Sequence, residues 1–178
     1  MRFISAKAHF IIFIAIFNRN SWFTYENNTY GIKIIYPYNW EKEEILSFNI
    51  VVLFRQALKE NSNSRSPVLI ISIENLTSYN MVSLDQFVAK QISNLTQSPS
   101  NYKIIESIPT TLGRDGNAAH KIVYGGISVF DKRTINGLEV CIIKDDKAYV
   151  ITSFTEANEY SKHISTIERM IDSFEMLR

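Results

Sequence analysis

The sequence predicts an α+β fold in which amphipathic helices pack on an antiparallel sheet. Several strand-like segments are joined by turns too short for a parallel crossover, so neighbouring strands must run antiparallel. Two strand segments, residues 68–73 and 148–154, are apolar on both faces and need cover on both sides of the sheet. Two segments with helical periodicity can supply that cover.

Length and composition indicate a single domain with its own core. The chain has 178 residues, of which 46% are hydrophobic, enough to bury a core and too many for a disordered chain. Its formal net charge is +1, so no overall field favours nucleic acid or an anionic membrane. The single cysteine, Cys141, excludes an intramolecular disulfide and a thiolate metal cluster.

Residues 1–23 form an apolar head and linker that we expect to precede one domain, residues 24–178. Arg2 and Lys7 come before the wholly apolar run 10–17, which is the layout of a secretory signal. This run is too short to span a bilayer, which needs about 20 residues. No small-x-small cleavage site follows. Four interpretations of this segment are therefore kept: a poorly cleaved signal, a truncated anchor, a misassigned start and a buried strand. We expect an exported or membrane-tethered, extracytoplasmic protein.

The first strand of the domain is expected at residues 30–36. Pro37 ends it, because proline lacks the N–H that a continuing ladder requires. Trp40 is interpreted as a plug of the core, with a ligand-facing side chain as the alternative. Around this strand we expect a polar joint (18–28), a charged segment (41–44), an apolar run (48–55), a loop (57–67) and a strand (68–75).

Two capping boxes predict where helices begin. Ser83 with Gln86, and Ser165 with Glu168, have the spacing at which the hydroxyl accepts from a free backbone N–H and the longer side chain reaches back. An apolar stripe at helical spacing accompanies each box. The stripes are Leu84, Phe87, Val88, Ile92 and Leu95, and Ile164, Ile167, Met170, Ile171 and Phe174.

Between the helices the chain is expected to be mostly strand. The strands are predicted at residues 102–110, 118–124, 138–144 and 147–155, with a small hairpin over 127–135. Glycine, asparagine and aspartate favour tight turns, and they predict turns at 113–116, 131–132, 136–137 and 145–146. The glycine pair at 125 and 126 is expected to interrupt the strand before it.

The sequence carries no motif for catalysis or cofactor binding. The glycine patterns of phosphate loops, dinucleotide-binding turns and nucleophile elbows are missing. His9, His120 and His163 are scattered without ligand spacing, so a metal role is the minority interpretation. Cys141 lies inside an apolar strand and is interpreted as an inert core thiol. We therefore predict no catalytic residue, no metal site, no cofactor and no enzymatic activity.

The carboxylates are the remaining candidates, and local structure is sufficient to account for them. Asp131, Asp145 and Asp146 are expected at hairpin tips, where aspartate bonds to nearby backbone N–H groups. Weak Ca²⁺ binding at these tips is the alternative, which no EF-hand-like spacing supports. Two other groups are read as surface or turn residues, with a functional cluster as the alternative: Glu156, Glu159, Tyr160 and His163, and Arg114 with Asp115.

The segment "TYENNTYGIKIIYPYNWEKEE" (24–44) resembles the opening of PsbP-like domains, where a Tyr/Gly-initiated strand leads into a Y-P-x-x-W motif. The resemblance continues through "SLDQFVAKQISNL" (83–95), "YKIIESIPTTLGRDGNAAHKIVY" (102–124) and residues 142–177. Its most specific part is "KAYVITSFTEANEYSKHISTIERMIDSF" (147–174), which looks most similar to the archaeal members of the family.

The resemblance implies an α/β/α sandwich with a central antiparallel sheet of about six or seven strands flanked by helices. The same fold is shared by the nuclear-import factor that binds the GTPase Ran. In photosynthetic organisms the family works outside the cytoplasm, as a non-catalytic subunit that helps the oxygen-evolving complex retain Ca²⁺ and Cl⁻. Cys141 stands near where relatives often have a tryptophan, so the fold carries over better than that role.

Three functions from different classes follow from these expectations, of which the last is an unrecognised enzyme that uses Asp or His in an aromatic-rimmed pocket. The first is a non-catalytic extracytoplasmic accessory or binding domain, docked on a membrane-associated complex, with weak Ca²⁺ binding by family analogy only. The second is an intracellular protein-binding module like the Ran-binding relative, which requires that residues 1–17 are not a signal. The sequence names neither the partner nor the residues that would bind a ligand.

Overall fold

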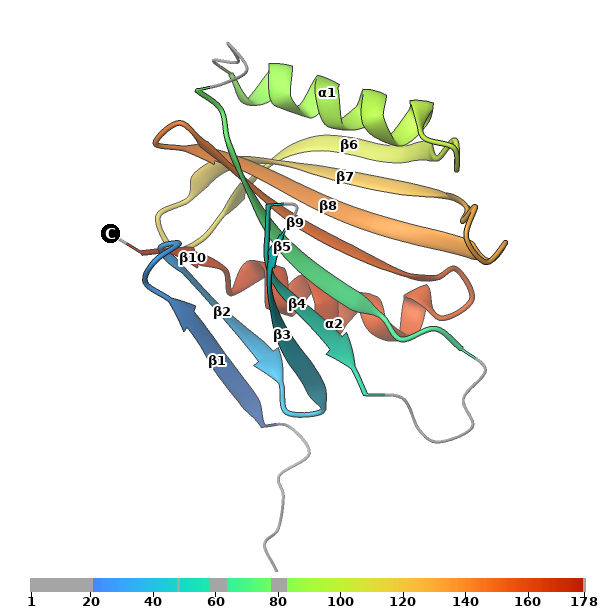
Figure 1. Ribbon diagram of the computed structural model, residues 1–178, viewed down its shortest axis with the longest axis horizontal. Coiled ribbons are helices and arrows are strands. Elements are labelled where there is room, and N and C mark those ends of the chain that lie inside the picture. The colour runs from blue at the N-terminus through green and yellow to red at the C-terminus, as the bar shows by residue number, and fades with distance from the viewer. Residues whose placement is uncertain (1–20, 48, 58–63, 78–82, 178) are drawn as a thin grey trace, which may run out of the picture.

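A seven-stranded antiparallel sheet forms the centre of the molecule (Figure 1). The structure is a computed structural model that describes residues 21–47, 49–57, 64–77 and 83–177. Each strand pairs antiparallel with its neighbours, as the short connections predicted. Across the sheet the order is β3 (Trp40–Ser47), β4 (Ile50–Gln56), β5 (Val68–Asn75), β9 (Lys147–Glu156), β8 (Thr134–Lys144), β7 (Asn117–Ile127) and β6 (Lys103–Leu112).

A second, smaller sheet joins the two ends of the described chain. It consists of β1 (Trp22–Asn27), β2 (Ile32–Pro37) and the short β10 (Glu175–Met176), with β2 in the middle. The strand predicted at 30–36 corresponds to β2, which begins two residues later than predicted and includes Pro37 as its last residue. The strand β1 lies in the segment that we expected to be a polar joint, so that expectation was wrong.

Helices and the small sheet cover the two faces of the large sheet. The helix α1 (Leu84–Gln97) lies over β6, β7 and β8, where its buried residues Phe87 and Val88 pack on one core cluster. The helix α2 (Tyr160–Asp172) and the small sheet bury a larger cluster against the opposite face. The α+β architecture with a central antiparallel sheet flanked by helices is therefore confirmed. Neither described helix is long and apolar enough to cross a membrane.

The turn predicted at Asn136 and Gly137 was wrong, because both residues lie inside β8 and pair with β7 and β9. A Cβ atom on Gly137 would stand 2.1 Å from Cζ of the Tyr124 ring, so glycine is required here by a close approach. Gly125 and Gly126 likewise lie within β7 and do not interrupt it. A Cβ on Gly126 would meet Tyr102 at 2.8 Å.

The other turn predictions are confirmed. Gly113 and Gly116 have positive φ angles of 76° and 61° and connect β6 to β7. Asp145 and Asp146 have φ angles of 49° and 58° and form the two-residue turn between β8 and β9, a conformation that aspartate tolerates better than most residues. The loop with Asp131 connects β7 to β8.

The helix boundaries agree with only one of the two predicted capping boxes. Ser83 is the N-cap of α1, and its Oγ accepts a hydrogen bond from the Gln86 backbone N–H at 3.2 Å. Ser165 is not a cap, because α2 begins at Tyr160, about one and a half turns earlier. Four of the five residues of the apolar stripe expected for α2 lie in the helix, and Phe174 is buried just after its end.

Candidate functional site

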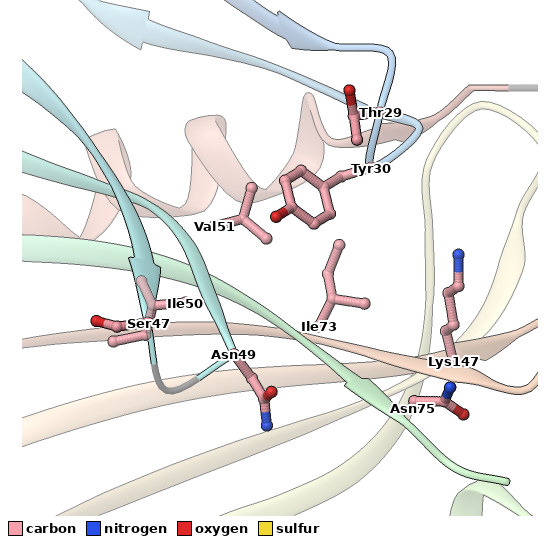
Figure 2. A pocket seen from close by; sticks show the side chains of 9 residues that line it. All are labelled: Thr29, Tyr30, Ser47, Asn49, Ile50, Val51, Ile73, Asn75 and Lys147. Carbon is pink, nitrogen blue, oxygen red and sulfur yellow. The ribbon is translucent and has the colours of Figure 1, made fainter.

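A pocket of about 470 Å³ opens where the β1–β2 turn approaches the ends of β4, β5 and β9 (Figure 2). Its lining combines apolar and polar side chains, a mixture typical of small-molecule sites. The ring of Tyr30 projects from the β1–β2 turn toward Val51 and Ile73. The lining residues are Thr29, Tyr30, Ser47, Asn49, Ile50, Val51, Ile73, Asn75 and Lys147.

The polar side of this pocket is built by two neighbouring strands. Asn75 at the end of β5 is the direct cross-strand partner of Lys147 at the start of β9, so their side chains project from the same face of the sheet. The Oδ1 atom of Asn75 accepts hydrogen bonds from the backbone N–H and the hydroxyl of Thr77, at 3.0 and 2.7 Å. The arrangement presents an amide NH₂ group and an ammonium group to the pocket.

A second pocket of about 420 Å³ lies between α2 and the small sheet, and both tryptophans of the chain line it. The Arg169 guanidinium stacks over the Trp22 ring at 4.2 Å from its centroid. Trp40 is only 5% exposed and belongs to the core, as predicted, and it also lines this pocket. His163 lies beside it; burial lowers the pKa of this imidazole, against the opposing effect of Glu159.

The β7–β8 tip, residues 128–133, presents the most exposed large hydrophobic side chain of the described chain. Phe130 at this tip is 91% exposed, and Ile127 immediately before it is 56% exposed. Ile105 on the edge strand β6 is also exposed and lies against Gly125 of β7. Exposed apolar side chains gathered at one end of a sheet mark an interaction site more often than scattered ones do.

The backbone of the β7–β8 tip is held in one conformation by several contacts. The Lys132 N–H donates to the Ser128 carbonyl, and the Ser128 N–H donates to the Arg133 carbonyl, both at 2.9 Å. The Asp131 carboxylate pairs with the Arg65 guanidinium at 2.7 Å and with Arg133 at 3.6 Å. The apolar side chain at the tip is thus presented from a fixed loop.

Glu139 in β8 is a functional candidate that the sequence analysis did not identify. Its side chain is buried beneath the α1 face, where Oε1 accepts from the Cys141 thiol at 3.5 Å and Oε2 from the Thr152 hydroxyl at 3.4 Å. Burial raises the pKa of Glu139 to about 7. Burial, reinforced by the Glu139 charge, also raises the pKa of Cys141, which keeps the thiol protonated. The sequence signal was a single carboxylate inside an apolar strand.

The charged residues considered as possible clusters are brought together only in part. Glu156 binds the Arg65 backbone N–H and the Arg133 guanidinium, whereas Glu159 pairs with Lys162 at 2.8 Å and lies 4.0 Å from Nε2 of His163. Arg114 at the β6–β7 turn pairs with Glu175 at 2.8 Å, and Asp115 beside it is exposed. Across the described ranges, no group of three or more His, Cys, Asp and Glu side chains is placed to hold a metal ion.

The predicted histidine positions also differ in their surroundings. His120 on β7 is half-buried, with Nε2 at 2.8 Å from the Ser107 hydroxyl, and His163 lies on α2. His9 and the whole predicted signal segment lie outside the described residues. The Asp145 and Asp146 side chains are exposed at the β8–β9 turn.

Solved structures with the same fold come from bacteria and a eukaryote. The cyanobacterial PsbP protein CyanoP from Synechocystis sp. PCC 6803 has a TM-score of 0.63 and 16% identity, covering 88% of this chain and 92% of its own. The Ran-binding protein Mog1p from Saccharomyces cerevisiae has a TM-score of 0.60 and 10% identity, covering 89% and 96%. LpqN of Mycobacterium tuberculosis, involved in cell envelope biogenesis, has a TM-score of 0.60 and 12% identity, covering 83% of each chain.

At these identities the structural likeness shows that the fold is shared, and it carries no information about activity. No curated protein matches the sequence. Among known protein families, the family described as PsbP-like protein matches residues 17–176, which include nearly every described residue. The chain therefore belongs to the PsbP-like protein family.

Proposed function

We propose that this protein is a non-catalytic binding module that docks, outside the cytoplasm, on a protein of a membrane-associated complex. Membership of the PsbP-like family supports the binding role. The signal-like head, which lies outside the described residues, is the reason for the extracytoplasmic part of the proposal. The similarity of residues 147–174 to archaeal members leads us to infer that the chain is of the archaeal type.

The observation that carries the docking role is the β7–β8 tip with Phe130 exposed on a fixed loop. A large aromatic side chain left in water gains roughly 2–3 kcal/mol when a partner buries it. Because the hydrogen bonds and ion pairs already fix the tip, little loop entropy is lost on binding. A protein partner with an apolar socket is the occupant that this geometry suits, since buried aromatic anchors dominate many protein interfaces.

An intracellular protein-binding module is the second candidate, favoured by the likeness to the Ran-binding protein Mog1p. The two candidates share the docking role and differ in compartment. Fractionation of a C-terminally tagged chain in its natural host separates them. Recovery from the membrane or exported fraction supports the first candidate, and recovery from the cytosol supports the second.

Photo-crosslinking tests the docking surface directly. Phe130 is replaced by benzoylphenylalanine in the full chain, expressed in its natural host and irradiated, and Phe23 is replaced in the same way as a control. Phe23 is a matched control because it is 50% exposed on β1, in the small sheet. We expect a discrete protein adduct from position 130 and none of the same mass from position 23.

The captured protein is then purified, and its binding is measured to the wild-type chain, to Phe130→Ala and to Phe23→Ala. Phe130→Ala should weaken binding by at least about tenfold, as expected for an interface hot spot, while Phe23→Ala should leave it unchanged. Adducts with lipid only, or equal effects of the two alanine variants, would overturn the proposal. Binding of the chain to protein-free phosphatidylcholine–phosphatidylglycerol vesicles, lost in Phe130→Ala, would reassign the tip to the membrane and also overturn it.

A further inference from the structure

Two lysines face each other beside the pocket of Figure 2. Lys147 on β9 is the cross-strand partner of Asn75 on one side and of Lys144 on β8 on the other. Cross-strand partners project from the same face, so two ammonium groups and one amide form a row across three strands. Like charges placed directly opposite destabilise a sheet, and this row lies at the end where the pocket opens.

The two lysines of this row flank Asp145 and Asp146 in the sequence but form no ion pair with them. None of the ion pairs between described residues involves Lys144 or Lys147. Asp145 and Asp146 form the turn between the two lysines, and the structure pairs neither of them with a cation. A bound anion would relieve the repulsion between the lysines, whereas a bound cation would add to it.

The amide of Asn75 is oriented to assist an anion. Its Oδ1 atom already accepts two hydrogen bonds from Thr77, so the side chain offers its NH₂ donors to the pocket. Hydrogen bonds from a charged or amide donor to a carboxylate are the strong kind, because one partner is ionised. Figure 2 shows Asn75 and Lys147 side by side along one wall.

The opposite wall is apolar and makes an inorganic ion a poor fit. The Tyr30 ring and Val51 form this wall, with Ile73 between it and Asn75, and the pocket volume of about 470 Å³ lies within the range of organic ligands. A ligand that used both walls would carry an anionic group at one end and an apolar body at the other. We propose that this pocket binds a small organic carboxylate, with its carboxylate on Lys147 and Asn75 and its apolar part against Tyr30.

Phenylacetate is a suitable probe because it has both parts. We expect saturable chemical-shift changes in a ¹⁵N-labelled full chain at pH 7, with a Kd of about 1 mM, as one charged contact and a small ring allow. The shifts should concentrate at residues 29–30, 49–51, 73–75 and 147. The neutral analogue phenylacetamide should bind at least about tenfold more weakly, and inorganic phosphate should give no saturable shifts.

Variants identify the residues that hold the probe. Lys147→Gln and Asn75→Ser should each weaken phenylacetate binding, the first by at least about tenfold, with the spectrum outside the pocket unchanged. Lys103→Gln on the edge strand β6 removes an exposed lysine away from the pocket and should have no effect.

Several outcomes would overturn the inference. They are the absence of saturable shifts, equal binding of phenylacetate and phenylacetamide, and equal affinity of the wild-type chain and Lys147→Gln. The inference does not depend on the docking proposal, because the pocket and the β7–β8 tip share no residue. Failure of one experiment therefore leaves the other unaffected.

Discussion

The buried carboxyl of Glu139 is the residue with the greatest expected effect on the pH dependence of stability. Its pKa is about 7 in the folded protein and about 4.5 in an exposed chain, so the folded state binds the proton more tightly. The stability that this group contributes is complete below pH 4.5 and is lost as the pH rises through 7. The loss corresponds to roughly 3 kcal/mol of the free energy of unfolding.

Glu139→Gln should remove this loss. Glutamine keeps the shape of the side chain but cannot become charged, so the variant should be more stable than the wild type at pH 8 by roughly 2–3 kcal/mol. At pH 4, below the ordinary pKa of the carboxyl, the difference should nearly vanish. Urea unfolding at the two pH values measures this, with Glu43→Gln on the exposed face of β3 as a control that should behave like the wild type. An equal fall in stability for wild type and Glu139→Gln would contradict the prediction.

Glycine shows why some residue-level predictions failed. A glycine after asparagine is a strong turn signal in sequence, and the same pair occurs at 136–137 for a different reason. Gly137 is needed because the Tyr124 ring crosses the sheet surface above it. That ring comes from a neighbouring strand, so the residues around Gly137 in the sequence do not predict the contact. At 113–116 the glycines have positive φ angles, and there the local signal was correct.

At the scale of elements, the two capping boxes differ in whether a free N–H group is present. The S/T-x-x-E/Q spacing also occurs inside helices, where all N–H groups are already bonded. Ser83 stands at a true helix start, but Ser165 lies in the second turn of α2. The sequence pattern is the same in both places, so the start of each helix depends on whether the residues before the serine are themselves helical.

Ser83→Ala and Ser165→Ala therefore form a matched pair. Ser83→Ala removes the acceptor for the Gln86 N–H and should lower the free energy of unfolding by about 1 kcal/mol. Ser165→Ala should leave it unchanged or raise it by roughly 0.5 kcal/mol, because alanine is the better helix former. Urea unfolding at pH 7 distinguishes the two, and a larger loss for Ser165→Ala would contradict the assigned start of α2.

The strands β5 and β9 were predicted closely, whereas β3 and β1 were not recognised as strands. The bounds of β5 and β9 were predictable because both strands are short, nearly continuous apolar runs, the pattern of a strand that is buried on both faces. The edge strand β3 contains "WEKEE", which reads as a charged loop because one side of an edge strand faces water. The strand β1 was missed for the same reason, since its only fully buried residue is Tyr25.

At the scale of the whole molecule, the C-terminal residues complete the small sheet and tie it to the end of α2 and to the β6–β7 turn. The Ser173 hydroxyl accepts from the Ile35 N–H at 3.0 Å, and the Leu177 N–H donates to the Gly31 carbonyl at 2.7 Å. The strand β10 closes the open side of β2, and Glu175 pairs with Lys33 and Arg114. A two-stranded ribbon alone is marginal in water, so β1 and β2 depend on this support.

Deletion of residues 175–178 should loosen the small sheet selectively. Loss of the β10 backbone bonds should speed amide hydrogen exchange in residues 22–37 by at least about tenfold, while exchange in β8 and β9 stays slow. Glu175→Gln is the control, because it removes two ion pairs and keeps the backbone bonds; exposed ion pairs contribute little. Uniform acceleration across the chain, or no change after the deletion, would contradict the proposed role.

The two pockets could not be predicted from the sequence, because their residues are not continuous; the β7–β8 tip is continuous, and the sequence predicted its hairpin but not the exposure of Phe130. The pocket of Figure 2 takes residues from the β1–β2 turn and from β4, β5 and β9, which are up to 118 positions apart between Thr29 and Lys147. Hydrophobic periodicity predicts which faces are buried, and it does not tell which strand ends meet. The family resemblance provided the topology, whereas the convergence of side chains required the structure.

Among the described residues the large sheet does not close on itself, and β3 and β6 each have one side along which no described strand pairs. Such edges invite pairing with another chain and eventual fibre growth. Both edges carry obstacles to it: β3 has four charged residues in succession and a bulge, and β6 has a bulge and Pro109. The chain thus keeps two open edges without offering either as a template for aggregation.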